Sequence, residues 1–382
     1  MKIALITDSF FSYDIDPAAH VGILAEGLGR IGHKAIVLVP EEELREPITE
    51  GRAIRFSGKA YPNEAGVQLS RKGMRQMEEK LLAFQPDLIH IHSLSETGAF
   101  ALHFSQEQQI PALLTVHSIE ELKKGGGSLP GAMFWKKRKR LQTAEAILEN
   151  AVNITCLSHA MTQAVKQLGY RVNQPVFPSA IDTEIFNHSA GDSSLKRSLS
   201  QSFSLQGKTT VVCSSQDADS LFPFLEEWSH AFSDADPIRL LIIDHGNQSD
   251  ELLSMLHTLG LSKRASLTGR LSREEKAACF QLSSCFILCS RSERFQLEAI
   301  EAAACGTPIL VQAQSGTAQI VDSGKNGFLW DSYRDLFELV KKFSKLTGPG
   351  KEALTRLVSG TVRTLTPQNQ ARAAEALYHT ML

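Results

Sequence analysis

The chain has 382 residues, of which 40 are Lys or Arg and 42 are Asp or Glu, so its formal net charge is −2. Hydrophobic residues make up 42% and charged residues 21% of the sequence, which excludes a disordered, collagen-like or coiled-coil chain. A charge this close to zero also excludes a surface devoted to nucleic acid, and the length predicts two domains of ordinary size.

The first 180 residues alternate short apolar runs with segments of helical periodicity. The apolar runs predict buried strands at residues 3–7, 35–39, 88–92, 112–117 and 153–157. Helical spacing of apolar residues predicts helices over 20–31, 74–84, 98–108 and 159–168. Alternation of this kind favours right-handed crossovers and therefore a parallel sheet.

A second series of the same kind begins near Thr209. Strands are predicted at 209–213, 240–244, 265–267, 285–289 and 308–311, and helices at 222–232, 250–259 and 273–281. Residues 175–187 contain two prolines and little periodicity, so the domain boundary is expected there, and a last helix is predicted at 367–381. Doubly wound sheets bind ligands at the carboxyl ends of their strands, so functional residues are expected at those edges.

Cysteine usage and hydropathy restrict the compartment. None of the six cysteines forms a Cys-x-x-Cys pair, which predicts reduced core thiols rather than a metal site. The apolar run at the N-terminus is too short for a signal peptide, and no run approaches the roughly 18–20 residues of a membrane span. We therefore expect a cytoplasmic protein that can associate peripherally with the inner face of the membrane.

The segment after the strand at 285–289 carries two glutamates eight positions apart, Glu293 and Glu301. A helix that begins near Gln296 would place Glu301 in its second turn and Glu293 in the preceding loop. Phosphate groups bind the amides of helix N-termini, and a carboxylate farther along can accept hydrogen bonds from ribose hydroxyls. The pair alone equally suits two solvated glutamates on an ordinary helix, and both interpretations stay open on these residues alone.

The wider pattern is more specific. Residues 290–308 (SRSERFQLEAIEAAACGTP) resemble the Glu-x7-Glu region of the retaining GT-B glycosyltransferases of family four. Further similarities lie at 315–327 (SGTAQIVDSGKNG), 267–272 (LTGRLS), 178–186 (PSAIDTEIF), 86–92 (PDLIHIH) and 114–117 (LTVH). The resemblance covers nearly the whole chain, and the membrane-associated, glycolipid-forming members are the most similar in pattern.

The resemblance implies an α/β protein of the GT-B fold, with two doubly wound Rossmann-like domains facing a cleft. The acceptor-side domain would span residues 1–178, the nucleotide-sugar-binding domain 179–364, and a C-terminal helix at 365–382 would cross back to the first domain. The implied activity is transfer of a hexosyl group, with retention, from a nucleotide sugar (UDP being favoured) to an acceptor such as a membrane lipid. No cofactor or metal is implied, and Asp14-Ile-Asp16 is not interpreted as a metal motif.

The family's site residues carry over by position. The residues that match Glu293 and His117 lie at the donor sugar and are the catalytic candidates, and the residue that matches Glu301 binds the ribose. The base would lie against Gly269, Arg270 and Leu271. The diphosphate would meet the segment of Arg294, Phe295, Gln296 and Leu297, where backbone amides can bind anions.

Three other histidines fall in matching positions. His20 is a candidate on the acceptor side, with helix capping or packing as an equally good interpretation. His90 and His92 lie at a strand end and are expected to be structural.

Several departures from the family pattern affect the diphosphate site. Where the family has an Arg and a Lys, residues 212–220 (VCSSQDADS) contain two carboxylates and no cation. The stretch from Asp8 to Ala19 lacks glycine, and Gln296 and Gln319 replace a family Gly and Glu. Acids beside a diphosphate would cost transition-state stabilisation.

These losses leave two alternatives open beside an active transferase. The first is a catalytically degenerate GT-B subunit that binds or stabilises a partner glycosyltransferase. The second is another nucleotide-sugar enzyme of the same fold, such as an epimerase.

The segment from Leu122 to Ala144 carries seven cations and no acidic residue. Its centre contains Trp135 followed by five consecutive cations: Lys136, Lys137, Arg138, Lys139 and Arg140. Aromatic residues beside clustered cations suit an anionic membrane surface, near which each cation contributes roughly 1 kcal/mol. A solvated basic helix is the alternative. Interleaved stacking aromatics are lacking, so no nucleic-acid partner is expected.

Overall fold

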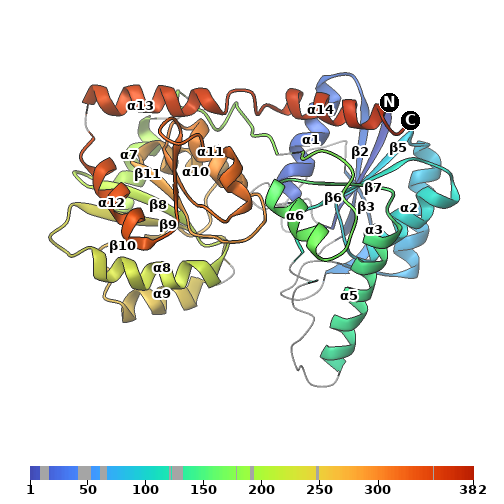
Figure 1. Ribbon diagram of the computed structural model, residues 1–382, viewed down its shortest axis with the longest axis horizontal. Helices are drawn as coiled ribbons and strands as arrows, with labels where there is room; N and C mark the ends of the chain where they lie inside the picture. The colour runs from blue at the N-terminus through green and yellow to red at the C-terminus, as the bar shows by residue number, and fades with distance from the viewer. Residues whose placement is uncertain are drawn as a thin grey trace. The chain divides into compact units, whose positions relative to one another are not determined.

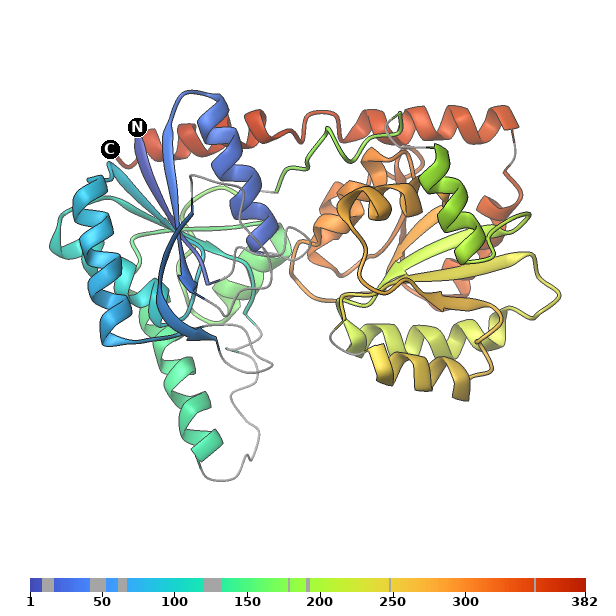
Figure 2. The same cartoon turned by 180° about the vertical axis from the view of Figure 1, so that it is seen from behind.

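The computed structural model describes residues 1–8, 17–41, 53–60, 67–119, 122, 132–177, 179–189, 193–246, 249–346 and 348–382. The chain divides into two compact units (Figures 1 and 2). The N-terminal unit consists of Met1–Ala180, Glu293–Phe295 and Leu365–Leu382, and the C-terminal unit of Ile181–Ser292 and Gln296–Thr364. Asp14, Asp16 and Pro178 lie outside the described residues.

The N-terminal unit is built on a seven-stranded sheet with the order β4-β3-β2-β1-β5-β6-β7. Its strands are β1 (Lys2–Ile6), β2 (Lys34–Glu41), β3 (Ala53–Ala60), β4 (Val67–Leu69), β5 (Leu88–Ile91), β6 (Ala112–Val116) and β7 (Asn153–Cys156). All neighbours are parallel except β3 and β4. The strand order reverses at β1, which pairs with β2 and β5, so the carboxyl edge beside β1 is the expected ligand position.

Helices cover both faces of this sheet because alternate strand residues point to opposite sides. Ala4 and Ile6 belong to a core shared with α2 (Arg71–Phe84), α3 (Glu96–Glu107), α5 (Ala132–Asn150) and α6 (His159–Gln167). Ile3 and Leu5 belong to the opposite core, which contains side chains of α1 (Ala18–Arg30) and α14 (Pro367–His379). The last helix therefore completes the core beside the first strand, and the two termini lie near each other (Figure 1).

The C-terminal unit has a six-stranded parallel sheet with the order β10-β9-β8-β11-β12-β13. Its strands are β8 (Thr209–Ser214), β9 (Ile238–Ile243), β10 (Ala265–Leu267), β11 (Cys285–Leu288), β12 (Ile309–Gln312) and β13 (Gly327–Trp330). The order reverses at β8, which pairs with β9 and β11. The carboxyl ends of these three strands therefore form the second expected ligand position.

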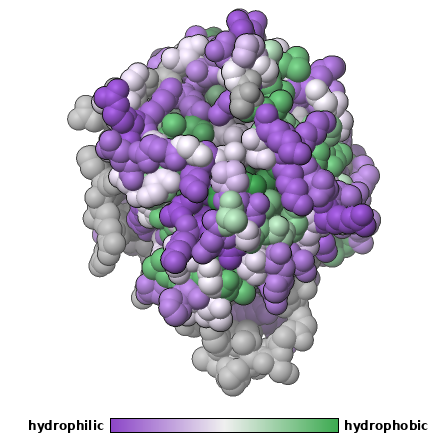
Figure 3. Space-filling view, turned by 90° about the vertical axis from the view of Figure 1, so that its left-hand side faces the viewer, coloured by the Kyte–Doolittle hydropathy of each residue, from purple (hydrophilic) through white to green (hydrophobic). Residues whose placement is uncertain are grey.

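An aromatic core covers one face of this sheet. It contains side chains of α8 (Ala218–Ala231), α9 (Ser249–Thr258) and α12 (Tyr333–Ser344), with Trp228, Phe224 and Phe337 in mutual ring contact. The remaining helices are α7 (Ser193–Ser202), α10 (Arg273–Leu282), α11 (Leu297–Ala304) and α13 (Gly348–Thr361), together with a 3-10 turn at Gly316–Ile320. The surface in Figure 3 is mostly hydrophilic with small scattered apolar patches, as is usual for a folded domain.

The predicted doubly wound α/β class is confirmed, and each predicted strand and helix has a counterpart in the structure. The elements that were not predicted include β3, β4 and α13. β3 and α13 mix polar, glycine and apolar residues without a clear period, and β4 has only three residues. All six cysteines are buried and unpaired. In the described part of the chain, no helix is long and apolar enough to cross a membrane, and no cluster of acidic, histidine or cysteine side chains is arranged for a metal ion.

Candidate functional site

The helix that was predicted after Glu293 begins at Leu297, with Gln296 as its N-cap residue. The Gln296 side chain makes no capping hydrogen bond, and its Oε1 is buried without a hydrogen-bond partner among the described residues. The backbone N–H of Gln296 donates to Thr317 Oγ1 at 2.8 Å. The first amides of α11 therefore have no capping side chain, and such amides are an available anion site.

The loop before α11 is held by residues of the N-terminal unit. Residues Glu293–Phe295 belong to the N-terminal unit, where Phe295 is buried. The Ser158 hydroxyl, which also caps α6, donates to the Glu293 carbonyl oxygen at 2.7 Å. This contact fixes the backbone of Glu293, and Arg294 follows it directly.

Glu301 lies in the second turn of α11 and is buried. Its Oε2 lies 2.9 Å from Lys276 Nζ of α10, and both side chains are at most 3% exposed. The Lys276 ammonium also lies over the Phe186 ring, 5.4 Å from its centroid. Glu301 and Lys276 therefore meet as a buried pair of opposite charges. Lys276 was not singled out from the sequence, since a single Lys within a capped helix carries no pattern of its own.

A second buried pair lies at the same edge of the sheet. His245, which follows β9, has its Nε2 3.1 Å from Glu298 Oε1 and 3.2 Å from Ser214 Oγ. Burial by itself would raise the pKa of Glu298. The charge and hydrogen bond of His245, the charge of Lys276 and a hydrogen bond with Ser214 together outweigh it, so the pKa lies below its ordinary value. Sequence reasoning missed this pair, although a glutamate inside an apolar helix was a signal that could have drawn attention to Glu298.

Residues 212–220, which lack the expected cations, contain the N-cap of helix α8. Asp217 is the N-cap residue of α8 and accepts hydrogen bonds from the Ser220 amide at 3.2 Å and the Ser290 hydroxyl at 2.5 Å. Its carboxylate is thus engaged with the positive end of a helix. The acid at this position has a structural role, which lessens its repulsion toward an anionic ligand nearby.

The turn after β10 carries the three residues that were predicted to contact the base. Gly269 has a φ of +67°, a conformation that favours glycine. The Arg270 side chain lies directly over Gly246, which follows β9. The contact is so close that a Cβ atom on Gly246 would lie only 2.9 Å from Arg270 Nε. The structure thus places Arg270 at the carboxyl edge of the sheet, with Leu271 next to it in the chain.

The N-terminal unit gathers four histidine rings at its own carboxyl edge. The ring centroids of His20, His92 and His117 lie 5.2–5.4 Å apart, and His90 lies 4.0 Å from His92. Burial is the main cause that lowers the pKa of all four, to about 3 for His20. The neighbouring Arg294 also lowers the pKa of His117, so these imidazoles are neutral at pH 7.

The hydrogen bonds within this cluster indicate where the protons lie. His90 is fully engaged, with Tyr378 OH at 2.8 Å and Thr115 Oγ1 at 2.7 Å, which agrees with its predicted structural role. His20 Nδ1 meets Ser179 Oγ at 2.6 Å and the Gln370 amide nitrogen at 3.3 Å. Because an amide nitrogen only donates, His20 Nδ1 accepts and the proton is on Nε2.

His92, which was also predicted to be structural, is buried beside His117. Its Nδ1 lies 3.0 Å from His117 Nε2, and its own Nε2 is buried without a partner in the described chain, as are His117 Nδ1 and His20 Nε2. One proton is shared in the His92–His117 hydrogen bond, so the two outer nitrogens always present one donor and one acceptor. With the His20 donor, the cluster can bind the hydroxyl groups of a polar ligand.

Asp8 lies at the carboxyl end of β1 in the same unit. Its carboxylate accepts hydrogen bonds from Ser93 Oγ at 2.6 Å and Ser95 Oγ at 2.8 Å. Burial raises its pKa, although these hydrogen bonds oppose the effect. Asp8 therefore anchors the loop that follows His92.

The five consecutive cations of the basic segment, residues 136–140, lie in the N-terminal part of α5. The side chains of Trp135 and Lys136 lie outside the described residues. Lys139 Nζ lies 2.6 Å from Glu96 Oε1 on α3, with 66% of the Lys139 side chain exposed. Arg138 is also exposed, while Lys137 and Arg140 are half-buried. Lys137, Arg138, Lys139 and Arg140 thus lie on a helix surface, and Lys139 forms an ion pair with Glu96 there.

Two family models match the chain. The model described as Glycosyltransferase Family 4 matches residues 18–185, and the model described as Glycosyl transferases group 1 matches residues 224–355. Among curated proteins, the alpha-monoglucosyldiacylglycerol synthase of Streptococcus pneumoniae is 20% identical over 88% of this chain and 76% of the relative. The protein of that name from Acholeplasma laidlawii is 21% identical over 88% of this chain and 86% of the relative.

Solved structures share the fold at low identity. The sucrose-phosphate synthase of Thermosynechococcus elongatus superposes with a TM-score of 0.76 at 19% identity, over 99% of this chain and 98% of that one. The Anabaena protein HepE, solved with UDP and glucose, has a TM-score of 0.74 at 16% identity and full coverage of both chains. The WaaG glycosyltransferase gives 0.69 at 12% identity, with 99% coverage of each chain. The expected GT-B architecture is confirmed by these similarities.

Proposed function

We propose that this glycosyltransferase transfers a glucosyl group from UDP-glucose to diacylglycerol, with retention of the anomeric configuration. The chain belongs to the glycosyltransferases, because the Family 4 model matches its N-terminal half and the group 1 model its C-terminal half. The names of the two full-length relatives motivate the product. The alpha configuration in those names equals that of UDP-glucose, so an alpha-linked product corresponds to retention.

The observation that carries the proposal is the segment of residues 293–301. It leaves the carboxyl end of β11, bonds its backbone to Ser158 through Glu293, and starts α11 without a side-chain cap. An uncapped helix N-terminus at a sheet's carboxyl edge suits a diphosphate, whose negative charge it stabilises. Glu301, fixed by Lys276 in the second turn, supports a role in binding the ribose hydroxyls.

The negative charge of the leaving UDP needs stabilisation. The family's Arg and Lys are absent from residues 212–220 of this chain, so other groups must provide it. Arg270 at the end of β10, Arg294 before α11 and the first amides of α11 are the groups of this chain that would meet it. Donors aimed at developing charge contribute about 10²–10³-fold each in rate when they are preorganised. No metal or cofactor is proposed for this step.

The histidine cluster would bind sugar or acceptor hydroxyls. Neutral imidazole nitrogens both donate and accept, which matches hydroxyl groups better than a charged side chain would. We assign His117 to the transferring sugar, with His92 and His20 as its neighbours. Glu293 would act on the donor sugar from the loop that Ser158 holds.

The test is turnover of the full chain with UDP-glucose, UDP-galactose, GDP-mannose and ADP-glucose, in anionic vesicles that contain diacylglycerol. Mass spectrometry detects the product, and the proton coupling constant of its anomeric hydrogen reports the linkage. An alpha-glucosyl lipid formed from UDP-glucose is expected. A beta linkage would exclude retention, and a thermal shift with UDP in the absence of any turnover would favour the degenerate-subunit alternative.

Two variants sharpen the test. Glu293→Gln should lower kcat by about 10²-fold or more with little change in the thermal midpoint, because the loop backbone stays bonded. Glu352→Gln is the matched control, since Glu352 is an exposed residue of α13 whose carboxylate lies 3.8 Å from Arg356. Equal activities of the two variants would exclude Glu293 from catalysis.

A further inference from the structure

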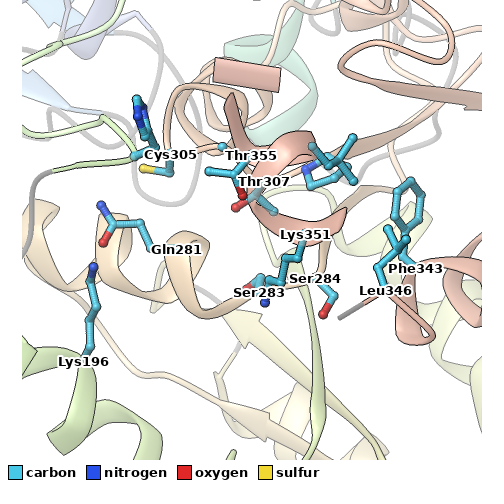
Figure 4. A pocket seen from close by; sticks show the side chains of 14 residues that line it. Lys196, Gln281, Ser283, Ser284, Cys305, Thr307, Phe343, Leu346, Lys351 and Thr355 are labelled. Carbon is cyan, nitrogen blue, oxygen red and sulfur yellow. The ribbon is translucent and has the colours of Figure 1, made fainter. Parts of the chain in front are cut away.

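The C-terminal unit contains a cavity of about 110 Å³ at the amino-terminal ends of its strands. Ser284, which directly precedes β11, and Pro308, which directly precedes β12, both line it. Figure 4 shows the lining side chains, which come from α7, α10, α12, α13 and the connections beside them. Ligands of doubly wound sheets bind at the opposite, carboxyl edge, so this cavity is separate from the donor site proposed above.

Positive charge is concentrated in the cavity lining. Lys196 of α7 and Lys351 of α13 line it, while none of the described lining residues is Asp or Glu. Two carboxylates close to lining residues in the sequence have other partners, since Glu301 pairs with Lys276 and Glu352 lies near Arg356. Within the described chain, neither Lys196 nor Lys351 lies within ion-pair distance of a carboxylate.

The lysines are also not explained as caps of the helices that end here. In the part of the chain that the structure describes, neither ammonium forms a hydrogen bond with a terminal carbonyl of α10, α11 or α12. The Lys351 side chain reaches the surface, and its partial burial lowers the pKa of its ammonium group. An ammonium in such surroundings gains when an anion enters, because the opposite charge favours its protonated form.

Two hydroxyl groups of the lining donate their protons to backbone carbonyl groups. Ser283 Oγ donates to the Cys279 carbonyl at 2.6 Å, and Thr307 Oγ1 donates to the Phe280 carbonyl at 2.5 Å. A hydroxyl has a single proton, so both oxygens can only accept from a ligand. The lining thus combines cations that suit an oxyanion with acceptors that suit a ligand hydroxyl.

Covalent chemistry is not indicated at this place. The Cys305 thiol lines the cavity, but burial raises its pKa far above the ordinary value. A thiol that stays protonated is a poor nucleophile. The cavity is therefore a place for non-covalent binding.

We propose that this cavity binds a small phosphate ester that carries hydroxyl groups, with the phosphate at Lys196 and Lys351 and the hydroxyls donating to Ser283 and Thr307. Its volume is several times the roughly 10–15 Å³ that one water molecule needs on the same measure, which leaves room for a small phosphate ester. The two lysines come from different helices, and Figure 4 shows both beside the polar residues of the lining.

The experiment is isothermal titration of the full chain with sn-glycerol 3-phosphate and, separately, with inorganic phosphate. The Lys196→Gln, Lys351→Gln double variant should weaken glycerol phosphate binding at least tenfold. The control double variant, Lys208→Gln with Lys263→Gln, removes the same charge from exposed positions outside the cavity and should leave the affinity unchanged. Circular dichroism and the thermal midpoint verify that each variant is folded.

A Ser283→Ala variant tests the hydroxyl acceptors, since it should weaken glycerol phosphate binding and leave that of inorganic phosphate unchanged. Absence of binding at millimolar glycerol phosphate, or equal loss in both double variants, would overturn the proposal. Equal affinity for glycerol phosphate and inorganic phosphate would overturn the part that concerns hydroxyl recognition. None of these outcomes depends on whether the chain transfers glucose.

Discussion

His92 Nδ1 lies 3.0 Å from His117 Nε2, so a pair of imidazoles joins the carboxyl ends of the neighbouring strands β5 and β6. With His20 and His90 beside them, these rings form a neutral polar cluster in a buried position. The cluster has consequences for stability as well as for ligand binding, because its residues must stay unprotonated in the folded protein.

The free energy of unfolding should decrease as the pH falls from 7 to 5. In the unfolded chain these histidines have the ordinary pKa of 6.5, whereas burial lowers it in the folded protein, to about 3 for His20. The unfolded state therefore binds more protons below pH 6.5, at a cost of about 1.4 kcal/mol per proton and pH unit. Urea denaturation at pH 7, 6 and 5 measures the slope.

A variant pair assigns that slope to the cluster. His92→Gln should reduce the pH dependence, whereas His257→Gln, at an exposed position of α9, should leave it unchanged. A stability that does not vary between pH 7 and pH 5 would contradict the assignment of neutral imidazoles.

Glu298→Gln should destabilise the C-terminal unit by about 3–5 kcal/mol at pH 7, because it breaks a buried pair with His245 and leaves one partner behind. The pKa of Glu298 is lowered in the folded protein, so its stabilising contribution is present above the ordinary value of 4.5 and is lost as the pH falls through the folded value. The difference between variant and parent should therefore shrink toward pH 3. Glu352→Gln is the exposed control.

Gly27→Ala and Gly360→Ala should have opposite effects on stability. A Cβ atom on Gly27 would lie 2.1 Å from the Pro367 carbonyl oxygen, so α1 and α14 would have to separate, at a cost of about 1–3 kcal/mol. Gly360 lies in α13 with no atom within 4 Å of its added Cβ, and alanine there should stabilise by about 0.5–1 kcal/mol. Thermal denaturation of the two variants compares them, and equal destabilisation would contradict the packing of α14 on α1.

Tyr378→Phe should lower the free energy of unfolding by about 1–3 kcal/mol. The Tyr378 hydroxyl is completely buried and lies 2.8 Å from His90 Nδ1, which would lose its partner. Tyr170→Phe serves as a control at a half-buried position. Urea denaturation measures both, and a neutral Tyr378→Phe would mean that the hydrogen bond to His90 does not anchor α14.

Replacing Lys136, Lys137 and Arg138 together by Gln should weaken binding to anionic vesicles by about 100-fold, at roughly 1 kcal/mol per cation. The control replaces Arg71, Lys72 and Arg75, which are three exposed cations of α2. Co-sedimentation at low and high salt measures both sets. If both triple variants bind the vesicles equally well, the basic segment is a solvated helix and not a membrane-binding surface.

The sequence by itself determined the two doubly wound units, because apolar residues recur with the period of each strand and helix and burial acts on that period. It also located the segment from Glu293 to Glu301 and its helix, since residue type and spacing define the motif. It marked the missing cations at residues 212–220 as well, but it did not show that Asp217 caps a helix there.

Only the tertiary structure decided which polar side chains meet. His90 and Tyr378 are 288 positions apart and bond directly, while His245 and Glu298 come from different strand–helix connections. The sequence placed His92 and His117 at two strand ends, but it did not show that they share a hydrogen bond. Such pairs depend on strand order and on the register of distant segments, and local periodicity does not encode either of them.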